Sequence, residues 1–179
     1  VTPFGDGFGM VVTFTEMGIY LNMRGDLDSC LRHCEESRHV YERLGDRQRL
    51  ATTLNNAGVY YKLRGEARQA LDRLKRSLSI NDGIDDSHGA GICLINLALL
   101  RLSLGDFEGA KRHSERVLKL AHDYGISWLK GHAYRSLGRV YLLQGELILA
   151  DRQLQRAEGV FRMLRHARNL SDVLLDRGE

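Results

Sequence analysis

The chain has 179 residues, 43% of them hydrophobic, which is enough to bury the core of one sizeable domain. Its formal net charge of +3 is too small to indicate a nucleic-acid binder, so no direct contact with nucleic acid is expected. The three cysteines are few and odd in number, so they do not form a disulfide framework. Free thiols favour a reducing compartment, and the cytoplasm is the expected location.

No apolar run is long enough to cross a bilayer and no signal peptide is recognisable, so no membrane association is expected. The chain begins at Val1 rather than at a methionine, so a removed upstream segment remains an open alternative. The only proline is Pro3, so the rest of the chain can form long helices.

Four glycines recur at every fortieth position, and each is preceded and followed by small residues at fixed distances. The glycines are Gly25, Gly65, Gly105 and Gly145. Seven positions before them come Gly18, Gly58, Ala98 and Gly138, and five positions after them come Cys30, Ala70, Ala110 and Ala150. A fixed period of this kind predicts an array of repeated structural units.

The predicted repeats are 11–50, 51–90, 91–130 and 131–170, followed by 171–179 as the start of a truncated fifth repeat. Together, 1–179 is expected to be a single domain cut from a longer array. Within each repeat the apolar residues are mostly three and four positions apart on both sides of the glycine, which predicts two helices joined by a tight turn.

The turn glycine is expected to adopt the left-handed conformation that ends a helix, because it has no Cβ to clash. The acidic residue after it is expected at the start of the second helix, where it interacts favourably with the helix dipole. These residues are Asp26, Glu66, Asp106 and Glu146. Asp6 and Asp46 are expected to cap the first helices. Gly58 and Ala70 are expected to let the two helices of a repeat approach closely.

The C-terminal tail carries Leu170, Val173 and Leu174, which would cover only part of the fourth repeat. A solenoid normally ends in a unit with a polar outer face. We therefore expect an apolar edge at this end, with self-association through the exposed repeat ends as one outcome.

The helix pair, the small residues and the turn glycine resemble the tetratricopeptide repeat. The residues that carry the resemblance are Ala57-Gly58, Tyr61, Gly65, Ala70 and Leu74 in the second repeat, Leu97-Ala98, Gly105 and Ala110 in the third, and Leu137-Gly138, Tyr141, Gly145, Ala150 and Ala157 in the fourth. The family's usual period is about 34 residues. The longer period of this chain is similar to the variants in kinesin light chains and in the sensor arrays of bacterial transcription regulators.

This resemblance implies an all-α fold, a right-handed α-solenoid of antiparallel helix pairs. In the family, the first helix of each repeat lines a concave groove that binds a peptide or a partner helix. The residues expected there as a peptide-binding site are Asn56, Asn96, Lys62, Asn55, Leu99, Arg135, Arg139 and His132. Asn56 and Asn96 match the asparagines with which peptide-binding members hold a peptide backbone, and an amide can both donate and accept. The alternative is that each asparagine bonds a neighbouring helix.

The apolar residues Ile92, Ile95, Leu99 and Leu102 indicate either a binding strip or burial against neighbouring helices. Arg135 and Arg139, with His132 a turn earlier, favour a partner that carries a carboxylate or an acidic stretch. The alternative here is an ordinary solvated helix face.

No catalytic or metal-binding pattern stands out, so the chain is not expected to be an enzyme and no cofactor is expected. Cys30, His33 and Cys34 have helical spacing, and the two cysteines occupy the places of Ala70 and Leu74, which indicates thiols in the core. The glycine-rich run 5–9 lacks the lysine of a phosphate-binding loop.

Three functional hypotheses follow from the sequence. The first is a non-catalytic protein–protein interaction scaffold. The second is a sensory or regulatory segment of a larger signalling protein or transcription regulator. The third is an oligomerisation module.

Overall fold

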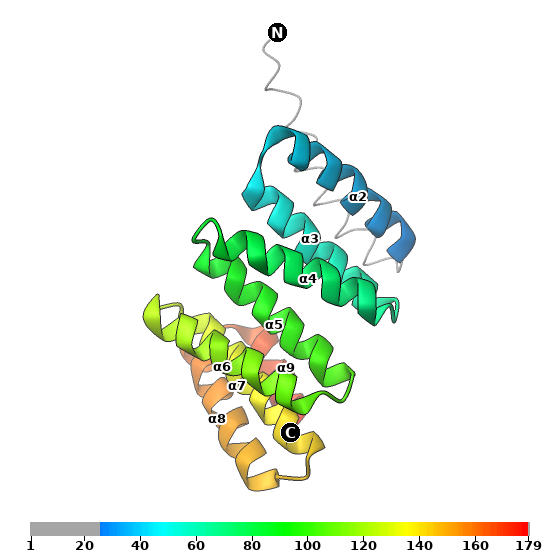
Figure 1. Cartoon of the computed structure of the whole chain (residues 1–179). Helices are drawn as coiled ribbons and strands as arrows, with labels where there is room; N and C mark the ends of the chain where they lie inside the picture. The colour runs from blue at the N-terminus through cyan, green and yellow to red at the C-terminus, as the bar shows by residue number, and fades with distance from the viewer. Residues whose placement is uncertain (1–25, 179) are drawn as a thin grey trace. The chain divides into compact units, whose positions relative to one another are not determined.

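The computed structural model describes residues 26–178, and all regular structure in that range is α-helical (Figure 1). The chain, expected from its sequence to be one domain, divides into two compact units, one ending at Asp86 and the other beginning at Ser87. The predicted cap Asp6, the small residue Gly18 and the turn glycine Gly25 lie outside the described residues.

The described part of the first unit consists of three helices, α2 (Leu27–Leu44), α3 (Arg47–Leu63) and α4 (Ala67–Asp82). α3 packs against both α2 and α4. The apolar stripe expected from the sequence forms the core, with Leu54 and Leu74 almost fully buried. Burial of each such leucine contributes about 1.5–3 kcal/mol, which makes this stripe the main source of stability.

The second unit consists of five helices, α5 (Ser87–Ser103), α6 (Phe107–Asp123), α7 (Ser127–Leu143), α8 (Leu147–Met163) and α9 (Ala167–Arg177). α7 is central, because it packs against α5, α6 and α8, and α9 packs against α8. Phe161, Leu154 and Val173 form a buried cluster under α9.

The helix pairs follow the period of the glycines, but each pair begins before the repeat boundary drawn from the sequence. First helices begin at Arg47, Ser87, Ser127 and Ala167, at every fortieth position. The boundaries at 51, 91 and 131 therefore fall one helical turn inside these helices. The offset arises because the predicted boundaries follow the spacing of the turn glycines, whereas each first helix begins after its own N-cap residue, such as Asp46. α9 overlaps the segment 171–179.

The turns confirm the predicted role of glycine. Gly65, Gly105 and Gly145 have φ of +84°, +73° and +80°, a region that other residues rarely adopt. A second left-handed position follows each second helix and recurs with the same period. Its occupants are Gly45, Asp85, Gly125 and Arg165. Two of the four are not glycine, so the backbone conformation is retained where the sequence signal is lost.

The small residues allow the close helix contacts that the sequence predicted. A Cβ at Gly58 would lie 2.6 Å from Cγ of Leu74, and a Cβ at Gly138 would lie 2.6 Å from Cγ of Leu154. Both distances are far below van der Waals contact, so in the second and fourth repeats a leucine of the second helix packs directly against glycine backbone of the first.

The predicted acidic helix starts are confirmed as positions, but only aspartate caps them with its side chain. Asp26, Asp46 and Asp106 each accept a hydrogen bond from the backbone N–H three residues later, at 3.0, 3.0 and 2.8 Å. Glu66 and Glu146 occupy the same place without a side-chain cap. The extra methylene of glutamate carries the carboxylate past the amide, and Glu66 pairs with Arg64 instead.

Candidate interaction surface

First helices of successive repeats present equivalent positions one repeat length apart, and two such helices, α5 and α7, pack together in the second unit. On α5, Ile92, Ile95 and Leu99 are half-buried and follow one another at helical spacing. The equivalent residues on α7 are His132, Arg135 and Arg139. We call these six residues, with Asn96, the first-helix surface. The apolar strip on α5 thus lies on a helix that packs against one carrying two arginines.

Arg135 is already engaged by two carboxylates of α9. Its Nε donates to Oδ2 of Asp176 at 2.5 Å, and its Nη1 donates to Oδ2 of Asp172 at 2.8 Å. Arg139 lies 3.9 Å from Asp176 and its side chain is 40% exposed. Of the two predicted arginines, Arg139 therefore has the greater capacity for an external carboxylate.

His132 lies within a row of aromatic side chains. Its ring centroid is 5.6 Å from that of Trp128 and 5.1 Å from that of Phe161, and Trp128 in turn lies 5.1 Å from His88. Burial lowers the pKa of His132, and the neighbouring Arg135 and His166 lower it further. The imidazole is therefore neutral at neutral pH and acts as a packing group rather than a cation.

The predicted asparagines differ in exposure. Asn56 and Asn96 are half-buried on their helices. Asn55 is only 8% exposed, because α3 is covered by helices on two sides. Its side chain belongs to the packed interior, and we do not include it in the surface. Lys62 is half-buried near the end of α3.

Two further residues of the first helices are also buried. Leu102 is 5% exposed and packs with Ala110 and Val140. Ser136 is 3% exposed and its Oγ lies 2.9 Å from that of Ser114. Of the alternatives weighed for the apolar strip, burial holds for Leu102 alone.

Sequence reasoning missed the acidic partners of Arg135. Asp172 and Asp176 follow it by 37 and 41 residues, close to one repeat length. A search for opposite charges about one period apart would have found this pairing, since first helices of successive repeats are neighbours. Arg177 also binds two carboxylates, Glu158 at 2.6 Å and Asp151 at 3.2 Å, but these lie 19 and 26 residues before it, so the same search would not have found them.

Cys30 is a core thiol, as predicted, and Cys34 is partly buried against the same apolar cluster. Cys30 and Cys93 are at most 1% exposed. Burial raises the pKa of Cys34 to about 12, so its thiol is protonated at neutral pH and is a poor nucleophile and metal ligand. Within residues 26–178, no three His, Cys, Asp or Glu side chains group as a metal site would require. In the same range, no helix has both the length and the apolar character needed to cross a bilayer.

Several solved structures share this fold. A STAND (Signal Transduction ATPase with Numerous Domains) protein with a tetratricopeptide repeat sensor, from Pyrococcus horikoshii, is 21% identical with a TM-score of 0.81, covering 97% of this chain and 27% of its own. Aspartyl phosphate phosphatase F from Bacillus subtilis is 13% identical with a TM-score of 0.83, covering 93% and 44%. At these identities the likeness shows the fold, and this chain spans less than half of either protein.

A kinesin light chain structure also shares the fold. The nearly identical TPR-like repeats of a putative kinesin light chain from Podosopora anserina are 14% identical with a TM-score of 0.70, covering 94% of this chain and 86% of that one. No curated protein matches the sequence. The neighbours confirm the predicted fold class, an all-α solenoid of helical repeats.

The sequence itself matches the family over more than half of its length. One tetratricopeptide-repeat profile matches residues 10–82, and a second matches residues 91–116 and 131–156. These matches include the turn glycines Gly65, Gly105 and Gly145 and the close-packing residues Gly58 and Gly138. The chain therefore belongs to the tetratricopeptide-repeat family.

Proposed function

We propose that this chain is a non-catalytic interaction module that binds a segment of another protein on its first-helix surface. Tetratricopeptide repeats generally mediate protein–protein interaction. The observation that carries the proposal is the apolar strip of Ile92, Ile95 and Leu99 beside the basic Arg139. A surface of this composition suits a partner with apolar residues next to a carboxylate.

The apolar strip supplies most of the binding free energy. Complete burial of an exposed aliphatic side chain contributes about 1.5–3 kcal/mol, so a half-buried one retains about half of that. Three such residues can offset a substantial part of the entropy cost of binding a peptide. The polar groups of the surface then select the partner and fix its register.

Arg139 selects for an acidic residue in the partner. Its contact with Asp176 is long, at 3.9 Å, and a ligand carboxylate can approach the guanidinium more closely. Arg135 serves instead to hold α9 in place, since both of its bonds go to that helix. Asn96, on the same surface, is suited to bonding a peptide backbone. Asn56 would do the same in the first unit.

A peptide selection tests the proposal. Random peptides displayed on phage and selected on the full chain should be enriched in acidic residues next to aliphatic ones. Leu99→Asp and Arg139→Glu should each remove most of the binding, whereas the exposed Lys75→Glu, on α4 of the first unit, should not. Enriched peptides that bind Leu99→Asp and Arg139→Glu as well as the parent would contradict the proposal.

The asparagines are tested separately. Asn96→Ala should weaken binding of peptides held by the first-helix surface while leaving the melting temperature nearly unchanged, and Asn56→Ala should do the same for peptides held by the first unit. A large drop in melting temperature would instead identify the asparagine as part of the packing between helices, which is the alternative that the sequence left open.

A second candidate function is a sensory segment of a larger signalling protein. It is favoured by the likeness to the Pyrococcus horikoshii protein, which is described as having a tetratricopeptide repeat sensor and of which this chain spans 27%. In that case, Arg139→Glu in the parent protein should change the parent's response to its signal. If peptide binding were lost but the response stayed unchanged, the sensory function would be contradicted and only the interaction function would remain.

A further inference from the structure

The second helices of successive repeats lie within side-chain reach of each other in the first unit. Glu42 of α2 accepts one hydrogen bond from Arg38 of its own helix at 2.6 Å and another from Arg76 of α4 at 2.8 Å. Glu42 thus pairs with two guanidinium groups on the face formed by α2 and α4, and Arg38 pairs with Glu35 as well.

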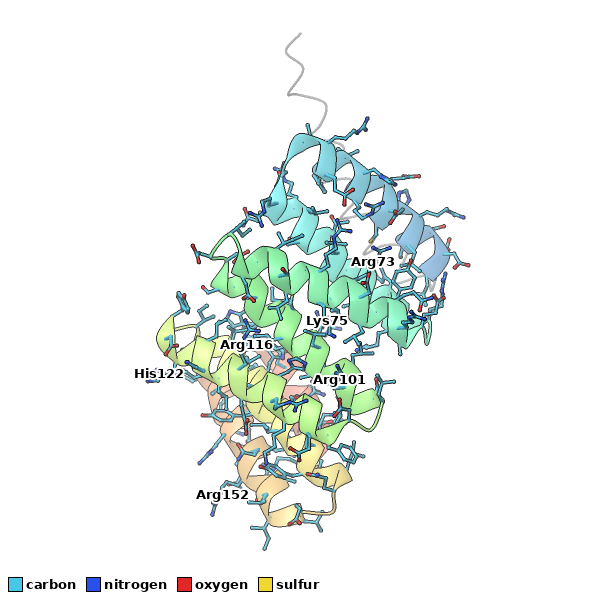
Figure 2. The ribbon with its side chains drawn as sticks, viewed as in Figure 1. Arg73, Lys75, Arg101, Arg116, His122 and Arg152 are labelled. Carbon is cyan, nitrogen blue, oxygen red and sulfur yellow. The ribbon has the colours of Figure 1, made fainter. Side chains whose placement is uncertain are left out.

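The second unit has no carboxylate at the equivalent place. The residues two repeat lengths after Glu42 and Arg76 are His122 and Arg156. The acid–base pair of the first unit is therefore replaced by a histidine and an arginine. His122 is 84% exposed, and its Nδ1 lies 3.3 Å from Oδ1 of the adjacent Asp123. Figure 2 shows His122 at the end of α6, extending outward from the ribbon.

Three arginines on this face pair with no carboxylate among residues 26–178. Arg112 lies on α6, and Arg152 and Arg156 lie on α8, and both helices pack against α7. Within that range none of the three has an acidic partner such as Glu42 provides for Arg76, and all three side chains are exposed. Arg152 extends away from α8 in Figure 2.

Tyrosines of α7 position two of the basic groups on this face. The guanidinium of Arg156 lies 5.7 Å from the ring centroid of Tyr134, and Nζ of Lys111 lies 5.6 Å from that of Tyr141. A cation–π contact orients the cation without neutralising its charge. Lys111, Arg112, Arg152 and Arg156 form what we call the second-helix surface.

An exposed apolar patch adjoins these arginines. Leu147, Ile148 and Leu149 at the start of α8 are 66%, 81% and 37% exposed. Ile148, Arg152 and Arg156 are four positions apart, so they lie in one row along the helix. The residues equivalent to Ile148 and Leu149 in the other repeats are Asp28-Ser29, Arg68-Gln69 and Glu108-Gly109. The patch is thus peculiar to the fourth repeat.

We propose that the second-helix surface binds an acidic segment of a partner protein in which a large apolar residue adjoins the carboxylates. The three arginines would take the carboxylates, and Ile148 with its neighbours would take the apolar residue. This is a second interaction surface, distinct from the one on α5 and α7.

A protein partner suits this surface better than nucleic acid does. Glu115 on α6 and Asp151 on α8 are exposed among the arginines. A continuous phosphate backbone would be repelled where it passes these carboxylates, whereas the carboxylates of a peptide can be spaced to avoid them. The apolar patch also has no use in binding phosphates.

Fluorescence anisotropy with the full chain tests the proposal. The probe is a fluorescein-labelled, glutamate-rich peptide that ends in leucines, compared with the same peptide ending in serines and with single-stranded DNA of equal charge. We expect the leucine peptide to bind most tightly and its affinity to fall as salt is raised. Arg112→Gln with Arg152→Gln should weaken binding about tenfold, the sum of two exposed ion pairs.

Two further variants complete the test. His122→Glu restores the first-unit arrangement, so the introduced carboxylate should pair with Arg156 and weaken peptide binding without lowering the melting temperature. Arg139→Glu, on the other surface, should leave this binding unchanged, which separates the two proposals. The proposal is overturned if the leucine peptide does not bind, if the arginine double variant binds it equally well, or if the DNA binds as tightly.

Discussion

The two units are built from the same helix pair but use their charged residues differently. Residues 26–86 contain eleven basic and eleven acidic residues, whereas residues 87–178 contain fourteen basic and nine acidic ones. The first unit pairs its second helices through Glu42 and Arg76. The second unit instead uses several of its ion pairs to hold α9, through Arg135 and Arg177. Its second-helix surface is left with an excess of positive charge.

This difference shows which positions the fold controls. Small and apolar residues recur in both units at the same places, because they set the distance between helices. Most charged residues on the exposed faces do not recur in every repeat, since single exposed ion pairs contribute little to stability. The exposed faces can therefore diverge between repeats and acquire different partners without loss of the fold.

Truncating the aromatic residue beneath the last helix should have the largest effect. Phe161 is fully buried, and a Cβ at Gly131 would lie 2.6 Å from its ring. Phe161→Ala should destabilise the second unit by about 3–5 kcal/mol through the cavity it leaves. Hydrogen exchange resolved by peptide should show lost protection in α7–α9 and unchanged protection in the first unit. Loss of protection in both units alike would mean that the comparison is not between independent units.

Overpacking the helix contacts should affect both units equally. Gly58→Leu and Gly138→Leu should each destabilise their own unit by about 1–3 kcal/mol, because a Cβ at either glycine would lie 2.6 Å from a leucine. Gly159→Ala is the matched control, since a Cβ there meets no atom within 4 Å. It should stabilise α8 by about 0.5–1 kcal/mol, measured by urea unfolding. If Gly138→Leu left the free energy of unfolding unchanged, the proposed close contact between the two helices would be contradicted.

Mild acid should destabilise the second unit selectively. Burial, with nearby arginines, lowers the pKa of both His132 and His113 below the ordinary value of 6.5. A group that is less basic when folded binds its proton more readily when unfolded, so its stabilisation is complete above about 6.5 and is lost as the pH falls below it. In the first unit, the bond with Arg38 lowers the pKa of Glu35, so the stability that this carboxylate contributes is lost only below about pH 4.5.

Melting curves recorded between neutral pH and about pH 5 check this prediction. His113→Gln combined with His132→Gln should flatten the dependence in that window. A first unit that loses protection from hydrogen exchange at the same pH as the second would contradict the assignment.

The smallest effect is expected at the left-handed turn positions that lack glycine. Arg165 has φ of +56°, where a side chain costs up to about 1–2 kcal/mol. Arg165→Gly should therefore stabilise the second unit by about 1 kcal/mol or less in urea unfolding, after the entropy cost of glycine. Asp85→Gly should gain less, because aspartate tolerates this conformation better. Equal gains would show that the two turns are equally strained.

The sequence predicted those features that depend on backbone geometry and close packing. Gly65, Gly138 and Asp46 stand where the local structure suits only a few residue types, so their roles could be predicted directly from the sequence. Pairings between side chains of different repeats could not be read in this way. The sequence predicts that Arg135 faces a ligand, and only the position of α9 shows that it binds Asp172 and Asp176.

Burial was also hard to predict for polar residues. Asn55 and Asn56 are adjacent and chemically identical, yet one is packed in the interior and the other is half-buried. Adjacent residues on a helix point about 100° apart, so one of the two can face the helices that cover α3 while the other lies at the edge of that contact. A periodic pattern defines that line only to within about one residue.

The same left-handed backbone conformation recurs at Gly45, Asp85, Gly125 and Arg165, so successive helix pairs begin and end in equivalent turns. Duplication or excision of the segment between two such points leaves the flanking helices in register and the turns intact. An insertion of any other length has to be absorbed in a turn. Growth and shrinkage of such a gene by recombination between its own repeats therefore preserve folding, and new surfaces arise by point mutation afterwards.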